Sequence, residues 1–292
     1  AIADLAQIEP RVLATLVGDY AFLKLCEGSS PYEAHARLYM GWEGGPLKKE
    51  NPPLYALAKA RVLALGYGAG WMKFIQMAPT YIFDEQILAD IFLKPVTTQT
   101  QAAFLEYLEA VSSFSGKLEQ FQAFPNLPEA QKRTWVNSWL QVTDFRTKNP
   151  KITSFWKSLA ADMERGPGIG AETRAFEVEF PNDRIKTYWQ VTNLKGNLKA
   201  VDVRGSTPKH YYGGILCENL TQGIARDVFF EGYLELSRRG YHIPLHVYDE
   251  NVIEIKEGES TVEIESVMKT RPDWFPDCPL DVEIELSPRY KK

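Results

Sequence analysis

The apolar positions of this chain follow two periods, and the change between them indicates how the chain is organised. The segment AIADLA, residues 1–6, is extended and apolar around Asp4, which predicts a short strand. The segment IEPRVLATLVG, residues 8–18, has apolar residues at helical spacing, and Pro10 fits a first helical turn. These residues therefore predict a strand that leads directly into a helix.

A long middle region keeps the helical spacing. The segment SSPYEAHARLYMGW, residues 29–42, begins with the serine, proline and glutamate of a helix start. The segment LYALAKARVLAL, residues 54–65, is rich in alanine and leucine and predicts a strong helix before the glycines of GYGAG. Amphipathic pieces continue to residue 165, and ERGPGIGAET, residues 164–173, is the clearest linker or turn.

After this linker the period changes to two. In FEVEF, residues 176–180, apolar and acidic residues alternate, and KTYWQV, residues 186–191, predicts the partner strand. A helical segment at 218–236 is followed by an apolar hairpin at 243–255, and TVEIESVMK, residues 261–269, predicts a last strand or helix. Helices in the middle and a sheet assembled from both ends of the chain predict an α+β fold.

Composition and charge narrow the class of protein only slightly. The chain has 292 residues, enough for two subdomains, and a formal net charge of −5, which neither advertises nor excludes a nucleic-acid binder. No apolar run reaches the length of a membrane span, and charged residues interrupt the first apolar stretch, so we expect no membrane association and a cytoplasmic location. Three scattered cysteines predict reduced thiols, and four histidines lack zinc-ligand spacing.

Carboxylates occupy the tip of the predicted hairpin. In LHVYDENVIEI, residues 245–255, Asp249 and Glu250 lie between two apolar runs. Taken alone, such residues are typical of a solvated turn. If Asp4 of the first strand lies beside them, the aspartates could hold two divalent cations roughly 3.5–4 Å apart, as in two-metal phosphoryl transfer. Without cations these carboxylates would repel one another, so the ions would also stabilise the site.

The alanine-rich helix carries a second candidate group. Lys59, Leu63 and Tyr67 are spaced four apart and share one predicted helix face. A cation and an aromatic ring on one face suit a nucleoside triphosphate, although a core stripe with a lysine reaching water has the same pattern. The glycines of GYGAG follow a helix, and no GxxxxGK[ST] is present, so the sequence contains no phosphate-binding loop of that type.

Three segments in this order resemble the sequence motifs of a known family. DLAQIEPRVLA, KARVLALGYG and HVYDENV are similar to motifs A, B and C of family A, or DNA polymerase I-like, DNA polymerases, especially the phage replicative type. ENLTQGIARDV resembles the helix before motif C, and SPRYKK the C-terminal end. The resemblance is clear over residues 1–75 and 205–260.

The resemblance implies an antiparallel-sheet palm with a mainly helical fingers subdomain inserted. Residues 1–20 would form palm with motif A, and residues 21–165 the fingers, with the motif B helix at about 53–68. Residues 166–292 would complete the palm, with the motif C hairpin at about 243–256. The implied activity is template-directed DNA synthesis, in which dNMP passes from a dNTP to a primer 3′-OH by two-metal nucleotidyl transfer.

The resemblance also implies roles at the metal site. Asp4 and Asp249, with the backbone carbonyl of Leu5, would ligate two Mg²⁺ ions, for which Mn²⁺ could substitute. Glu250 would be the accessory carboxylate near the primer end. Lys59 would bind the triphosphate and assist the departing pyrophosphate.

Further residues would select the nucleotide and hold the duplex. Glu9 would be the steric gate against a ribose 2′-OH, paired with Tyr67, which closes the base-pair pocket. Leu63 and Gln7 would complete the nucleotide site. Gln222 and Arg11 would contact the primer–template.

The match departs from the family at several positions. Tyr55 stands where an arginine often binds the γ-phosphate, and the cations that could compensate are Lys48, Lys49 and Arg61. Leu63 stands at a commonly aromatic position, and Tyr248 where histidine commonly precedes the motif C aspartate. None of these changes removes a metal ligand.

Motif A begins almost at residue 1, whereas in the family the thumb and any exonuclease come before it. From the sequence we therefore expect the catalytic C-terminal half of a split, phage-type polymerase acting in the host cytoplasm. A separate polypeptide would supply the thumb, with or without an exonuclease.

Two other readings stay open. A single-subunit RNA polymerase would share the palm, although Glu9 and the Asp249–Glu250 pair favour the DNA enzyme. The chain could also be a non-catalytic subunit that binds primer–template DNA within a replication complex, which retention of Asp4, Asp249 and Lys59 opposes. A metal-dependent phosphatase or nuclease would leave the helix from Lys59 to Tyr67 without a function.

Overall fold

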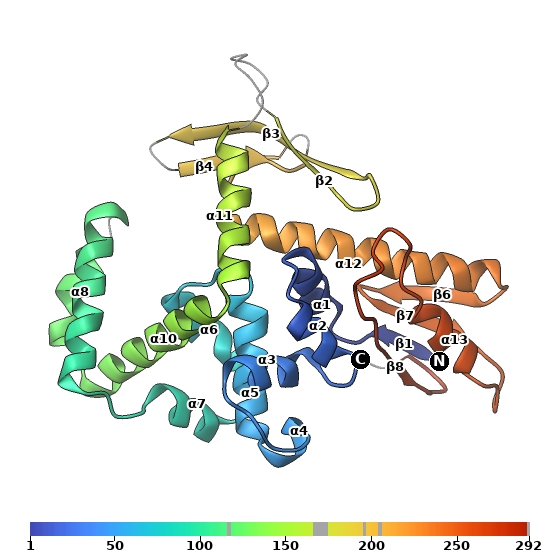
Figure 1. Ribbon diagram of the computed structural model, residues 1–292, viewed down its shortest axis with the longest axis horizontal. Helices are drawn as coiled ribbons and strands as arrows, with labels where there is room; N and C mark the ends of the chain where they lie inside the picture. The colour runs from blue at the N-terminus through green and yellow to red at the C-terminus, as the bar shows by residue number, and fades with distance from the viewer. Residues whose placement is uncertain (116–117, 166–174, 195–196, 204–205, 291–292) are drawn as a thin grey trace. The chain divides into compact units, whose positions relative to one another are not determined.

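The structure, a computed structural model, describes residues 1–115, 118–165, 175–194, 197–203 and 206–290. The chain divides into two compact units (Figure 1). The first unit consists of Ala1–Ala34 and Lys151–Lys292, and the second of His35–Pro150. The sequence placed boundaries near residues 20 and 165. The roles of palm and fingers stay predictions.

A four-stranded antiparallel sheet forms one part of the first unit. Its strands lie in the order β6-β7-β1-β8. Their bounds are Ile2–Leu5 for β1, His242–Val247 for β6, Glu250–Glu254 for β7 and Val282–Glu285 for β8. Apolar residues of β1, including Ala3 and Leu5, are almost fully buried, so this short strand is an internal strand of the sheet. The predicted first strand and the predicted hairpin are therefore paired directly.

Helices of the first unit pack around this sheet and each other. Their bounds are Ile8–Leu16 for α1, Tyr20–Cys26 for α2, Pro150–Arg165 for α11, Gly213–Arg238 for α12 and Val262–Met268 for α13. The longest of them, α12, contacts both α1 and α13. It begins at Gly213, where a Cβ atom would lie 1.9 Å from the backbone oxygen of Trp156 in α11. Only glycine allows the two helices to approach this closely.

A second antiparallel sheet belongs to the same unit. Its strands are β2 (Phe176–Glu179), β3 (Ile185–Leu194), β4 (Asn197–Val201) and β5 (Lys209–His210), in this order. The predicted hairpin of FEVEF and KTYWQV thus forms a sheet of its own, whereas the sequence pattern suggested a single sheet. The Tyr188 hydroxyl of β3 accepts a hydrogen bond from Asn219 of α12 at 3.1 Å, which anchors this sheet to the helix.

The second unit is helical in its described residues. Its elements are α4 (Leu47–Glu50), α5 (Pro52–Ala60), the π-helix η1 (Arg61–Leu65), α6 (Trp71–Tyr81), α7 (Glu85–Phe92), α8 (Thr98–Ser115), α9 (Leu118–Ala123), the 3₁₀ helix η2 (Phe124–Asn126) and α10 (Glu129–Lys148). The helix α3 (Pro31–Tyr39) spans the division between the units. Aromatic rings of α6, α8 and α10, among them Trp71, Phe104 and Trp135, form its core.

The structure refines several predictions. The segment predicted as a last strand or helix is the helix α13. The alanine-rich helix begins at Pro52, and the side-chain oxygen of Asn51 caps it by accepting a hydrogen bond from Leu54 N at 3.1 Å. That helix becomes a π-helix at Arg61, which propensity did not indicate. In the predicted linker, Glu164 and Arg165 end α11, and residues 166–173 lie outside the described residues, as do the last two residues of SPRYKK.

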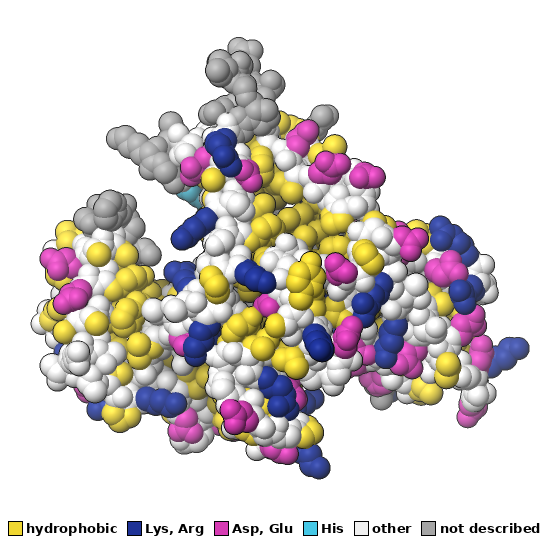
Figure 2. All heavy atoms as spheres, in the orientation of Figure 1, with side chains coloured by type: hydrophobic (Ala, Val, Ile, Leu, Met, Phe, Trp, Pro, Cys, Tyr) yellow, Lys and Arg dark blue, Asp and Glu magenta, His cyan; other side chains and the backbone are white. Residues whose placement is uncertain are grey.

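The distribution of charge agrees with the modest net charge of −5. On the face shown in Figure 2, basic and acidic side chains are interspersed. Across the part of the chain that the structure describes, no helix combines the length and hydropathy needed to cross a membrane.

Candidate active site

Strand register brings the predicted carboxylates together. In the β1–β7 pair, Asp4 lies opposite Glu250. Residues directly opposite each other in an antiparallel pair have their side chains on the same face of the sheet. The amide of Leu5 donates to the backbone oxygen of Asp249 at 3.1 Å. The backbone therefore places Asp4, Asp249 and Glu250 side by side at one end of β1, although 245 positions separate Asp4 from Asp249 in the sequence.

A tight turn presents Asp249. Val247 of β6 pairs with Glu250 of β7, so only Tyr248 and Asp249 form the turn between them. Tyr248 has a φ of 57°, in the left-handed region, and its side chain is 86% exposed. A bulky residue in this region is strained by roughly 1–3 kcal/mol, and such strain gathers at functional sites. The hairpin therefore maintains an unfavourable backbone at the residue before the predicted metal ligand.

Glu9 of α1 joins the same neighbourhood. Its carboxylate accepts a hydrogen bond from the side chain of Gln222 in α12. Burial raises the pKa of Glu9, the Gln222 hydrogen bond opposes this rise, and the charges of Asp249 and Glu218 add to it. Burial also raises the pKa of Glu218. Several acidic groups thus share this part of the first unit, and their mutual repulsion favours a cation among them.

Gln7 forms the junction between β1 and α1. Its φ of 48° and ψ of 52° place it in the left-handed region, at the N-cap position of α1. This conformation turns the chain sharply from the strand that carries Asp4 into the helix that carries Glu9. Gln7 therefore has a visible structural role, and its predicted role in nucleotide binding stays a prediction.

Arg11 corrects a sequence-based prediction. It was expected to contact the primer–template, but it is 1% exposed. Its guanidinium donates to the backbone oxygens of Ala6 at 3.1 Å, Cys26 at 2.7 Å and Pro279 at 3.3 Å. A side chain covered in this way cannot reach DNA. Arg11 instead ties the start of α1 to two other segments of the first unit, which supports the strand-to-helix junction.

The donor set at the end of β1 fits Mg²⁺. Asp4, Asp249 and Glu250 offer only carboxylate oxygens, the ligands that hard cations prefer. In the described ranges, no group of three or more His, Cys, Asp or Glu residues is arranged to hold a metal ion. Binding of Mg²⁺ by these carboxylates therefore stays a prediction.

The predicted triphosphate-binding residues lie in the second unit. Lys59 on α5 and Leu63 in the π-helix are half-buried, and Tyr67, just after it, is 9% exposed. The first unit carries Asp4, Leu5, Gln7, Glu9, Arg11, Gln222, Asp249 and Glu250. The structure brings together the members of each group within their own unit.

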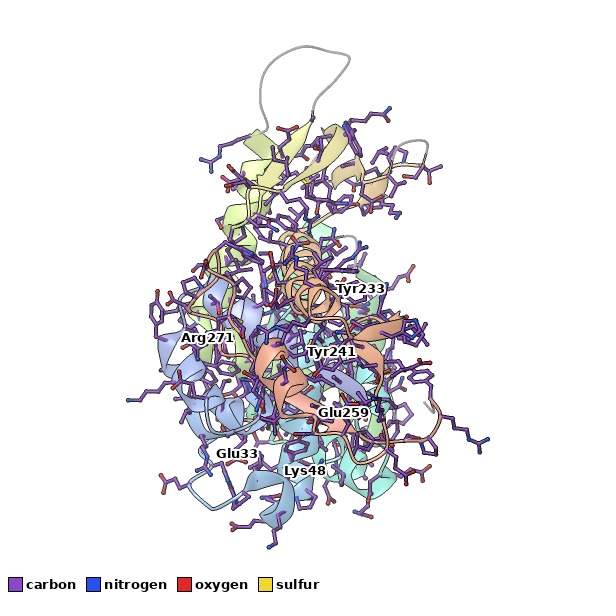
Figure 3. The ribbon with its side chains drawn as sticks, turned by 90° about the vertical axis from the view of Figure 1, so that its right-hand side faces the viewer. Glu33, Lys48, Tyr233, Tyr241, Glu259 and Arg271 are labelled. Carbon is purple, nitrogen blue, oxygen red and sulfur yellow. The ribbon has the colours of Figure 1, made fainter. Side chains whose placement is uncertain are left out.

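Of the three cations considered as substitutes for the missing arginine, Arg61 is engaged elsewhere. It is 3% exposed, and it donates to Asp144 Oδ2 at 2.7 Å and to Gln141 Oε1 at 3.0 Å. Lys48 of α4, labelled in Figure 3, instead has its Nζ 5.9 Å from the ring centroid of Tyr55, the residue that stands where the family often has an arginine. Lys48 is therefore the better placed of these two.

Sequence reasoning missed the role of Glu218 and the contact between Gln222 and Glu9. Glu218 lies one helical turn before Gln222, so both share a face of α12, which the spacing alone could have indicated. The contact of that face with α1 joins residues 9 and 222, and no local pattern predicts it.

Comparisons with known proteins agree with this arrangement. No family model matches the sequence. Over its entire length the chain is 24% identical to a DNA polymerase of Bacillus phage SP02, and it spans 41% of that protein. A similar solved structure is the POL domain of Pol1 from M. smegmatis in complex with DNA primer-template and dNTP, with a TM-score of 0.52 and 14% identity over 97% of this chain and 38% of that one. The α+β fold of a polymerase domain and the resemblance to a phage DNA polymerase are confirmed.

Proposed function

We propose that this chain carries the catalytic site of a DNA-directed DNA polymerase, which transfers dNMP from a dNTP to a primer 3′-OH under the direction of a template. One observation carries the proposal. The register of β1 with the β6–β7 hairpin places Asp4 opposite Glu250 and next to Asp249. The similarity to a phage DNA polymerase supports it. So does a fold shared with a polymerase domain that was solved with primer-template and dNTP.

Asp4 and Asp249, with the backbone carbonyl of Leu5, would hold two Mg²⁺ ions, and Mn²⁺ could replace them. The bound ions would lower the pKa of the primer 3′-OH and neutralise charge on the transferred phosphoryl group. The carboxylates themselves orient and hold the reacting groups at the end of the sheet. Glu250, on the same face as Asp4, is proposed as the accessory carboxylate near the primer end.

Glu9 is proposed as the gate that excludes a ribose 2′-OH. Its carboxylate is largely buried beside Asp249 and is held by the Gln222 side chain, so it occupies a fixed position near the metal site. A fixed, bulky side chain excludes an added hydroxyl by shape. Gln222 is exposed, which suits its proposed contact with the primer–template. Gln7 is proposed to complete the nucleotide site.

The first unit is proposed as the palm and the second as the fingers. Within the second unit, Lys59 would bind the triphosphate and assist the departing pyrophosphate. Leu63 would line the nucleotide site, and Tyr67 would close the base-pair pocket. Lys48, above the Tyr55 ring, would supply charge for the γ-phosphate.

The chain spans 41% of the phage relative, so the activity of a whole polymerase involves parts that lie outside these residues. We propose that a thumb, with or without an exonuclease, is supplied by another segment or by a separate polypeptide. A phage replication enzyme of this kind would act in the host cytoplasm.

Primer extension tests the proposal. The chain is incubated with primer–template DNA, Mg²⁺ and either dNTPs or rNTPs, in the wild-type form and as Asp249→Asn, with the candidate partner polypeptide added in a parallel series. Extension with dNTPs that is lost in the variant supports a DNA polymerase. Preference for rNTPs would favour the RNA polymerase reading. DNA binding without extension in either series would favour the non-catalytic subunit.

A further inference from the structure

The turn between β2 and β3 packs closely against α12, next to Gln222. The turn lies beside α12 (Figure 1), and Arg184 hydrogen-bonds to Gly223 and Asp227 of that helix. A Cβ atom at Gly223 would lie 2.5 Å from ring atom Cε2 of Phe180 and 3.2 Å from Nη2 of Arg184. A side chain at this position would therefore displace the Phe180 ring and crowd the Arg184 guanidinium.

Arg184 contacts two groups of the helix and one ring of its own turn. Its Nε donates to Asp227 Oδ2 at 2.8 Å, and its Nη2 donates to the backbone oxygen of Gly223 at 3.0 Å. Its guanidinium also lies 4.1 Å from the ring centroid of Phe180. Asn182 Nδ2 donates to the same oxygen of Asp227 at 3.0 Å. Because the Asp227 side chain is only 17% exposed, solvent screens the Arg184–Asp227 ion pair less than it screens an ordinary surface pair.

Two backbone hydrogen bonds within the turn hold its conformation. Phe180 N donates to Arg184 O at 2.8 Å, and Asp183 N donates to Phe180 O at 3.0 Å. Asp183 adopts a left-handed φ of 62°, which an aspartate tolerates well in a turn. Arg184 therefore projects from a turn whose backbone is closed by its own hydrogen bonds.

The two sides of α12 have different partners. Glu218 and Gln222, one turn apart, both interact with Glu9. Gly223 and Asp227, also one turn apart, contact the β2–β3 turn. At 100° per residue, the second pair lies roughly 100–140° around the helix from Gln222. A contact on the second side therefore adds to the packing against α1 and α13 in fixing the rotation of the helix, and with it the direction in which Gln222 points.

We propose that Arg184 is a positioning residue for the polymerase site. By locking the rotation of α12 it holds the Gln222 amide on the Glu9 carboxylate, and so it sets the discrimination between deoxyribonucleotides and ribonucleotides. This inference rests on the proposed function of Glu9 as the sugar gate. It assigns a function to a hairpin that contributes none of the predicted site residues.

The test compares four variants with the wild type in single-nucleotide incorporation. Arg184→Ala removes all three contacts, Arg184→Lys keeps the charge, Asp227→Ala removes the acceptor, and the double variant removes both partners. Lys186→Ala is the matched control, because Lys186 lies on the same hairpin and its Nζ is 5.4 Å from the Tyr188 ring centroid instead.

We expect the ratio of kcat/KM for dNTP to that for rNTP to fall roughly tenfold in Arg184→Ala, as for the loss of one charge-assisted hydrogen bond. Arg184→Lys should fall between Arg184→Ala and the wild type, and Lys186→Ala should match the wild type. The double variant should match Arg184→Ala, because the two residues act as one unit. An unchanged ratio in Arg184→Ala, with incorporation retained, would overturn the inference.

A second readout does not depend on catalysis. The Glu9 carboxylate is titrated by NMR in the wild type and in Arg184→Ala, with Glu9→Gln to assign its signal. Because the Gln222 hydrogen bond lowers the pKa of Glu9, its loss should raise that pKa further. If the wild type makes no product either alone or with the candidate partner polypeptide, the proposed function fails, and the titration still tests whether Arg184 holds Gln222 on Glu9. A Glu9 pKa that is the same in Arg184→Ala and in the wild type would refute the positioning role of Arg184. If Arg184→Ala does not fold, Arg184→Lys takes its place in this comparison.

Discussion

The two units hold their charged residues in opposite ways. In the first, backbone register gathers Asp4, Asp249 and Glu250 at the end of a sheet, beside the partly buried Glu9. In the second, Asp144 neutralises the buried guanidinium of Arg61, and Gln141 accepts a hydrogen bond from it. Like charges kept together are expensive unless a ligand compensates them, whereas a satisfied buried pair is typical of a structural role. The contrast separates residues positioned for chemistry from residues that hold the fold.

The same contrast applies within one helix of the second unit. Lys59 and Arg61 are two residues apart. Lys59 is half-buried and, among the described residues, makes no ion pair, while Arg61 is nearly fully buried and paired. Proximity to a motif therefore does not make a cation a phosphate ligand. The structure assigns Arg61 to the core, and the role of Lys59 in binding a triphosphate stays a prediction.

The largest expected effect is at the end of β1. Asp4→Asn should lower the rate of nucleotide incorporation by roughly a thousandfold or more, because metal-assisted stabilisation of the transferred phosphoryl group is worth several kcal/mol. Glu250→Gln, directly opposite Asp4, should cause a smaller loss because its proposed role is accessory. Single-turnover incorporation measures both. Equal losses, or none for Asp4→Asn, would contradict the roles given to the two carboxylates.

The next largest effect is expected at Lys59, the cation of the second unit that makes no ion pair among the described residues. Lys59→Ala should reduce kcat/KM for dNTP by roughly a hundredfold, the size expected when a charged group that stabilises a phosphoryl transition state is removed. Lys73→Ala, at an exposed lysine of α6, is the control and should change little. Steady-state kinetics over a range of dNTP concentrations provides the measurement. A loss at Lys73 as large as that at Lys59 would indicate general charge attraction rather than a specific contact.

A third prediction concerns stability. Asp144→Ala should lower the free energy of unfolding of the second unit by about 2–3 kcal/mol, because it leaves the Arg61 guanidinium buried without its partner. This is below the value for a fully buried pair, since the Asp144 side chain is 37% exposed. Urea unfolding followed by tryptophan fluorescence, to which Trp71 and Trp135 of this unit contribute, would measure it.

The matched variant is Arg61→Met, which removes the buried charge together with its need for a partner. It should destabilise the unit less than Asp144→Ala. A larger loss in Arg61→Met would show that the guanidinium contributes more than its pairing with Asp144.

The smallest effect is at Glu9. Burial raises the pKa of Glu9, so the folded state binds this proton more tightly than the unfolded state does. Stability from this group is therefore present below its unfolded pKa and is lost as the pH rises through the folded pKa. At neutral pH, Glu9→Gln should stabilise the protein by about 1 kcal/mol while weakening sugar selection, a trade common at functional sites. Thermal unfolding at pH 7.5 would detect it, and a stabilisation that grows as the pH falls would contradict the sign.

Much of the first sheet could be predicted from the sequence because its signals are local. The apolar strand around Asp4 and the hairpin at Asp249 both have a clear pattern, and register follows from the turn. The separation of a second sheet was not visible, because alternation shows that a strand exists and does not show which strand it pairs with. The π-helix at Arg61 likewise follows no local propensity.

The predicted site residues also differ in whether local sequence or long-range packing decides their position. Backbone pairing places Asp4, Asp249 and Glu250 at neighbouring positions, as expected, and their role as metal ligands stays a prediction. Arg11 was misassigned, because two of its three acceptors come from segments far along the chain, at Cys26 and Pro279. A motif can name a residue, but only the packing around it shows whether its side chain reaches the ligand or the core.

The most direct test of the central claim is template-directed addition of one nucleotide. Four primer–templates that differ only in the first template base are each offered the four dNTPs singly, with Mg²⁺, with EDTA, and with Asp249→Asn in place of the wild type, all in the presence of the candidate partner polypeptide. The account predicts addition of the complementary dNMP on each template, and loss of addition both with EDTA and in the variant. Addition that persists in Asp249→Asn, or that ignores the template base, would contradict it.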